Sequence, residues 1–176
     1  MKTTGMFRMM ILLSALTAVN SYADVIINVS ADMVEPICDI RSNDSSAPLK
    51  INFGPQNIAA LNKATAVQQF PLYLSNCNFN KNLAIMITPN TGKSLVYNGK
   101  KVLETSIANL GISFNDMTGG TAKSLSVGEA LRLTPVKVSD TGYRIDLQAD
   151  LVTPVEPEKL ALGKFTASAV VQVVYD

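Results

Sequence analysis

The last fourteen residues of the chain, from Gly163 to Asp176, carry a sustained alternation of apolar and polar side chains. Alternate side chains of a strand share one face, so the segment is predicted to be a strand with one apolar face. The apolar set is Phe165, Ala167, Ala169, Val171, Val173 and Tyr175, with Thr166, Ser168 and Gln172 on the other face. An exposed edge of such a strand promotes aggregation. No further strand follows in this sequence, so we expect the outer edge to be completed from elsewhere.

The opening segment, Met1 to Ala23, has the features of a secretory signal peptide. Lys2 and Arg8 give it a positive start, and Met9 to Val19 is largely apolar. Small residues at Ser21 to Ala23 offer a cleavage site. A membrane anchor would need about 20 uninterrupted apolar residues, which this segment lacks. We therefore expect the chain to be exported.

Cleavage after Ala23 would leave 153 of the 176 residues, enough for one domain with a hydrophobic core. It would remove two of the 15 basic residues and none of the 14 acidic ones, so the mature chain would carry a net charge of −1. A nucleic-acid-binding domain would need a basic patch. The charge balance therefore argues against a nucleic-acid partner.

The chain has two cysteines, Cys38 and Cys77, and no histidine. Exported proteins meet an oxidising compartment, so one disulfide is the favoured interpretation. It would close a loop and stabilise the fold by about 3–4 kcal/mol on a loop-entropy estimate. A metal site or a catalytic thiol is the alternative, but both commonly rely on histidine or on further cysteines.

The segment that follows the predicted cleavage site, Asp24 to Val34, also alternates. Its apolar positions are Val25, Ile27, Val29, Ala31 and Met33. It could be the first strand of the domain's own sheet. However, Pro36 cannot donate to a sheet ladder and predicts a break. We therefore expect a separable extension at 24–36, after the signal peptide at 1–23 and before a domain at 37–176.

The rest of the chain is predicted to form short strands between turn residues, without an amphipathic helix of useful length. Ile58 to Ala66 is the best candidate for a helical turn or two, and Pro71 indicates an edge position. Strands are predicted at 49–53, 68–77, 82–88, 110–114, 130–138 and 143–152. Several strands without intervening helices predict an all-β sandwich.

Candidate catalytic motifs are weak. Thr91 to Ser94 (T-G-K-S) matches the end of a phosphate-binding loop, but Ile87 stands where the loop needs glycine. No Gly-x-Ser-x-Gly nucleophile motif occurs, and without histidine the commonest general base is missing. The carboxylates most easily imagined as a pair are predicted to be solvated surface groups: Asp146, Asp150, Glu156 and Glu158. The sequence therefore predicts no enzyme.

These features together resemble a pilin of the bacterial chaperone–usher pathway. Gly163 stands fourteen residues from the end, with a penultimate Tyr175 and the alternating strand between them. Cys38 and Cys77 stand where the family places its disulfide, and an alternating extension precedes Cys38. The resemblance covers the whole chain.

The resemblance implies an incomplete immunoglobulin-like sandwich of six strands that lacks the seventh. In such a subunit a periplasmic chaperone lends a strand to the groove beside Gly163 to Asp176 and anchors the carboxylate of Asp176. At an outer-membrane usher, the extension of the next subunit replaces the chaperone strand. The extension positions Val25 to Met33 would then be a donor strand. The family often has glycine where this sequence has Ala31, which is expected to narrow the choice of partner or shift the register.

The sequence therefore predicts a structural subunit of a surface fimbrium that supports cell adhesion, of the minor, tip or adaptor type. Its implied partners are other pilus subunits, the chaperone and the usher, with no nucleic acid, small-molecule substrate, cofactor or metal. The alternative is a single-domain adhesin that binds a host receptor through its loops. A secreted enzyme is disfavoured by the missing catalytic residues.

Overall fold

The computed structural model describes residues 38–43, 48–63 and 66–176, so the predicted signal peptide and extension lie outside the described residues. Every strand pair in these ranges is antiparallel, and the helical segments are three short 3-10 turns. No helix in the described part of the chain is long and apolar enough to cross a membrane. The all-β prediction is confirmed.

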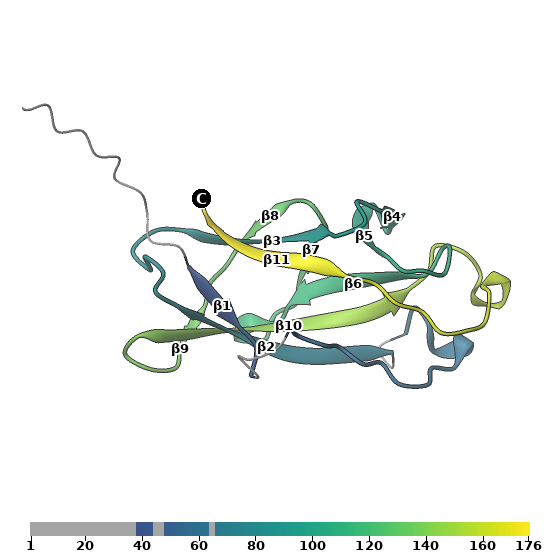
Figure 1. Cartoon of the computed structure of the whole chain (residues 1–176), viewed down its shortest axis with the longest axis horizontal. Helices are drawn as coiled ribbons and strands as arrows, with labels where there is room; N and C mark the ends of the chain where they lie inside the picture. The colour runs from purple at the N-terminus through teal and green to yellow at the C-terminus, as the bar shows by residue number, and fades with distance from the viewer. Residues whose placement is uncertain (1–37, 44–47, 64–65) are drawn as a thin grey trace, which may run out of the picture. The chain divides into compact units, whose positions relative to one another are not determined.

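Two sheets make up the described fold, and Figure 1 shows them as two layers. The larger sheet has the order β1-β2-β10-β6-β5-β4, with β7 beside β6 and β9 beside β10, and the smaller sheet has the order β11-β3-β8. The strands are β1 (Asp39–Arg41), β2 (Val67–Ser75), β3 (Leu83–Pro89), β4 (Ser94–Tyr97), β5 (Lys100–Glu104), β6 (Gly111–Asp116), β7 (Lys123–Leu125), β8 (Ala130–Arg132), β9 (Val136–Lys137), β10 (Gly142–Val152) and β11 (Ala169–Tyr175). The 3-10 turns are η1 (Ile58–Ala60), η2 (Thr118–Gly120) and η3 (Pro157–Lys159).

The core lies between the two layers and follows the alternation of the strands. On β10, Ile145, Leu147 and Ala149 are fully buried, whereas the residues between them are partly exposed. Ile85 and Ile87 of β3 meet this face from the smaller sheet. Because side chains at i and i+2 of a strand share a face, the pairing register of a strand determines which of its residues are buried.

The predicted strand positions agree with the structure where alternation is strong and differ elsewhere. The predicted strand at 130–138 is two strands in different sheets, β8 and β9, separated by a segment that contains Pro135. The strand predicted from Gly163 begins only at Ala169, because Thr166 instead pairs with Ser106 in a loop. The segment predicted as a strand at 49–53 has no strand pairing with any described residue.

The β4–β5 hairpin was not predicted, although its turn is clear in the sequence. Asn98 and Gly99 have φ values of 49° and 77°, and a two-residue hairpin turn of type I′ requires positive φ at both positions. Among the described residues of the helical turn expected at 58–66, the short η1 is followed by a turn at 61–63. Pro71 lies in the part of β2 that extends beyond β1, so that stretch is an edge among the described strands, as predicted.

We predict that Leu74→Ala destabilises the fold strongly, whereas the same change at Leu162 does not. Leu74 is fully buried and Leu162 is 84% exposed, so only the first change removes core contacts. Emptying a buried leucine site costs about 2–5 kcal/mol, and surface changes stay within about 0.5 kcal/mol. Urea unfolding of both variants measures the difference. Equal losses in the two variants would contradict this description of the core.

Candidate functional site

An apolar groove runs between the edges of the two sheets. In the described residues, β11 ends the smaller sheet and pairs only with β3, while β1 ends the larger sheet. A hollow of about 650 Å³ opens between these edges. We call it the edge groove. Its walls are the segment 48–53 on one side and the segment 165–171 on the other.

The floor of the edge groove is the hydrophobic core itself. The buried side chains that reach it come from both sheets and are Leu72, Ile87, Leu103, Ile112, Phe114 and Leu147. Phe53 and Phe165 both line the groove and lie close together, with ring centroids 6.3 Å apart and planes tilted by 48°. These floor residues are buried, whereas Ile51, Phe70 and Phe165 along the groove are only partly buried, so apolar surface there remains to be covered.

Four residues of the predicted groove strand line the edge groove: Phe165, Ala167, Ala169 and Val171. The first two precede β11, so part of the wall is an extended loop rather than a strand. Val173 and Tyr175 are partly buried against the core beyond the groove lining. Gly163 and Asp176, at the two ends of the predicted strand, are exposed and do not line the groove.

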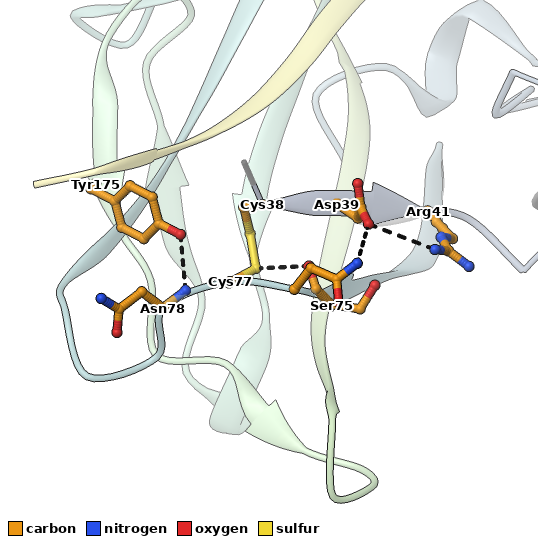
Figure 2. The surroundings of a disulfide bond; sticks show 8 residues. Cys38, Asp39, Arg41, Ser75, Cys77, Asn78 and Tyr175 are labelled. Atoms are coloured by element: carbon orange, nitrogen blue, oxygen red, sulfur yellow. Dashed lines mark hydrogen bonds and ion pairs between the residues drawn. A yellow bond between two sulfur atoms is a disulfide. The ribbon is translucent and has the colours of Figure 1, made fainter. Parts of the chain in front are cut away.

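The far end of β11 is tied to the connection between β2 and β3 beside the disulfide, as Figure 2 shows. Cys38 and Cys77 form the predicted disulfide, with Cα atoms 4.3 Å apart. The backbone N–H of Asn78 donates a hydrogen bond of 2.9 Å to the Tyr175 hydroxyl. The backbone N–H of Asp176 donates to the carbonyl of Asn82 at 3.0 Å. These contacts hold the last residues of the chain while the wall at 165–171 stays open.

The disulfide also joins β1 to β2 at the start of the domain. Cys38 stands directly before β1 and Cys77 lies two residues after β2, so the covalent bond closes the end of this strand pair. The side-chain amide of Asn76 donates to the Asp39 carboxylate at 2.6 Å. Arg41 lies 3.8 Å from the same carboxylate, in a solvent-exposed ion pair that contributes little. The short β1 is thus fixed chiefly by the disulfide and its pairing with β2.

The predicted donor strand cannot be placed, because Val25, Ile27, Val29, Ala31 and Met33 lie outside the described residues. Its role therefore stays a prediction.

A second concavity, of about 460 Å³, lies on the outer face of the larger sheet and was not predicted. We call it the polar hollow; Asp150 lies in it. Burial raises the pKa of the Asp150 carboxyl, while hydrogen bonds from Gln148 and Asn115 lower it. Asp150 is therefore a recessed group rather than the fully solvated one expected. Asp146 makes a 3.1 Å ion pair with Arg144, and Glu156 and Glu158 are exposed, as expected.

The sequence contains the residues of the polar hollow in a recognisable pattern, but only the strand register shows that they lie together. Gln148 and Asp150 are the polar positions of an alternating strand, and the Asn98-Gly99 turn brings Tyr97 and Lys100 to its rim. Nothing in the sequence alone says that Asn115 stands opposite Gln148. The pairing of β6 with β10 supplies that information.

Comparison with protein-family models identifies the family of this chain. The model of the fimbrial protein family matches residues 26–176. A search of curated protein sequences found no match.

Solved structures share the fold at low sequence identity. The P pilus rod subunit PapA is 18% identical with a TM-score of 0.56, over 79% of this chain and 99% of PapA. A subunit from a chaperone–usher pilus structure is 18% identical with a TM-score of 0.54, over 92% of this chain and all of that one. The P pilus adaptor subunit PapF is 18% identical with a TM-score of 0.52, over 81% of this chain and 98% of PapF.

These likenesses confirm the incomplete immunoglobulin-like sandwich that the sequence predicted. The family match extends over most of the chain, from the predicted extension through the final strand. This chain therefore belongs to the fimbrial protein family and has the fold of chaperone–usher pilus subunits.

Proposed function

We propose that this chain is a structural subunit of a bacterial surface pilus that polymerises by donor-strand exchange and thereby supports cell adhesion. The observation that carries the proposal is the edge groove. It carries partly buried apolar side chains next to the hydrophobic core, and it lies between two sheet edges that have no partner among the described strands. An inserted strand would cover the apolar floor and pair with exposed backbone groups, which is the mode of strand addition.

The segment 49–53 supports this proposal. Leu49, Ile51 and Phe53 alternate as in a strand and line the edge groove, yet the segment pairs with no described strand. A strand inserted between this segment and β11 would offer pairing partners to both walls. The sequence pattern of a strand at 49–53 is then explained by a partner that comes from another chain.

The extension at 24–36 of another subunit is the proposed occupant. Burying Val25, Ile27, Val29 and Met33 would contribute roughly 6–12 kcal/mol as an upper estimate, before the ladder hydrogen bonds. Each subunit would then carry one donor strand and one edge groove. Because this head-to-tail contact does not close on itself, it builds a filament.

Delivery by a periplasmic chaperone and assembly at an outer-membrane usher complete the proposal. A chaperone strand would protect the same apolar floor until the next subunit arrives, because an open core promotes aggregation. Asp176 is exposed beside β3 with its N–H bonded to Asn82, so its carboxylate can be reached by basic side chains of a chaperone. The function needs no cofactor, nucleic acid or substrate, and it is not enzymatic.

Fusing a second copy of Asp24 to Pro36 after Asp176, through a short flexible linker, is predicted to give a stable monomer. The added strand would fill the edge groove within the same chain. A gain of several kcal/mol would raise the thermal midpoint by more than about 10 °C for a chain of this size. Thermal unfolding of the mature chain and of the fusion, in matched buffer with the disulfide intact, measures the rise. Equal midpoints would mean that the sandwich is already closed.

Val171→Asp in this fusion is predicted to abolish the gain, whereas Gln172→Asp retains it. Val171 lines the edge groove, so the variant places an unpaired charge against the inserted strand. Gln172 is the next residue of β11 and is exposed on the other face. The matched pair separates loss of groove binding from a general effect of a new charge in β11. The thermal midpoints of the two fusions, measured together, decide the point.

Ile27→Asp in the extension is predicted to block insertion of this subunit into a neighbour while its own edge groove still accepts a donor peptide. The added charge cannot be buried in the apolar groove without a large penalty. Assembly of the variant with wild-type subunits, together with binding of a synthetic 24–36 peptide, provides the two measurements. If Ile27→Asp instead unfolds the domain, residues 24–36 form an internal strand and the proposal fails.

A further inference from the structure

We propose that the polar hollow binds a carbohydrate through a pair of neighbouring hydroxyl groups. The hollow lies on the outer face of the larger sheet, and none of its described lining residues also lines the edge groove. Ligand binding in the polar hollow is therefore independent of polymerisation, and this proposal can be tested separately from the function proposed above.

The floor of the polar hollow is assembled by strand register. Gln148 of β10 stands opposite Asn115 of β6, and Asp150 is two residues along; all three line the hollow. On its other side Gln148 stands opposite Gln69 of β2, which lies beside the lining residues. The neighbours of Gln148 on β10, Leu147 and Ala149, are fully buried, so this row points away from the core. Four polar side chains from three strands are thus brought to one face.

Hydrogen bonds hold this floor in a fixed orientation. The Gln69 amide donates to Oε1 of Gln148 at 2.9 Å, and the Gln148 amide donates to Oδ1 of Asp150 at 2.8 Å. The Asn115 amide donates to Oδ2 of Asp150 at 2.6 Å. An ionised carboxylate only accepts, so it turns the NH₂ groups of Asn115 and Gln148 toward itself. The floor is therefore organised before any ligand arrives.

The floor retains capacity for both kinds of hydrogen bond. Each Asp150 oxygen accepts one bond from the described residues and has lone pairs for another. The Asn115 amide has a second N–H and a carbonyl oxygen. A hydroxyl group donates to one partner and accepts from another, so two adjacent hydroxyls match a carboxylate and an amide side by side.

The rim adds an aromatic ring and two cations. Tyr97 and Lys100 come from the β4–β5 hairpin, and Lys63 comes from the loop after η1. The Lys100 ammonium donates to the Ser124 carbonyl at 2.9 Å, which holds this side of the rim against β7. The half-exposed Tyr97 ring offers an apolar surface for the C–H face of a sugar ring, and the lysines offer donors to its hydroxyls.

Other ligand classes fit the polar hollow less well. An apolar ligand would leave the carboxylate and the amides without water or partners, which is costly. An anion would meet the Asp150 charge on the floor, and within the described residues no cluster of three metal-ligating groups exists for a cation. A sugar with adjacent hydroxyls satisfies the donors and the acceptors together. Its source can be a host glycan or a bacterial polysaccharide, because both present the same diol.

Saturation-transfer NMR tests the proposal with the exported full-length chain and the methyl glycosides of mannose, galactose and glucose. At least one glycoside is expected to receive saturation from the protein. Asp150→Asn and Tyr97→Ala are each expected to weaken its binding at least about tenfold, as loss of a hydrogen bond to a charged group or of a stacking surface does. A glycan array that carries host-type and bacterial glycans then identifies the source.

Asp146→Asn is the matched control. Asp146 is on the same face of β10 but outside the polar hollow, so this variant is expected to bind like the wild type. Thermal midpoints of the variants show that the fold is kept, and Tyr97→Ala changes a hairpin side chain that is not part of the core. No binding to any glycoside or array glycan, or equal binding by all three variants, would overturn the proposal.

Discussion

The described fold depends on one constraint: the two sheets bury a shared core, but their facing edges do not meet. β10 pairs with β2 and β6 and supplies fully buried residues at every second position, so it anchors the larger sheet. The smaller sheet covers this core with β3 and β11 and ends there. Apolar side chains along the edge groove remain in reach of water. The hydrophobic effect that stabilises the core therefore also favours covering this groove.

The sequence predicted elements best where alternation and burial coincide. The strand predicted at 143–152 is β10, and the strand predicted at 82–88 is β3, because both alternate against a common core. Alternation misled the interpretation at Phe165 and Ala167, which line the groove from a loop whose backbone bonds to Ser106. Alternation indicates which side chains face the core, but it does not indicate whether a neighbouring strand pairs with the segment.

The features that the sequence did not predict depend on pairing between distant segments. The edge groove needs the positions of β1, the segment 48–53 and β11 together. The polar hollow needs the register of β2, β6 and β10, which places Gln69, Gln148 and Asn115 in one row. The Asn98-Gly99 turn can be recognised from the local sequence and indicates the hairpin. It does not indicate which residues lie beneath the hairpin. Local chemical features can thus be recognised in the sequence, whereas the spatial neighbours of each residue depend on the topology of the sheets.

The disulfide has a mechanical consequence for a filament subunit. A pulling force applied before Cys38 passes through the covalent bond to Cys77, at the end of β2, and the intervening residues from Asp39 to Asn76 carry no tension along the backbone. From Cys77 the load continues along the backbone to β3, whose seven register pairs with β11 lie along the strand. Such a load would shear many hydrogen bonds at once instead of peeling β1 away one pair at a time.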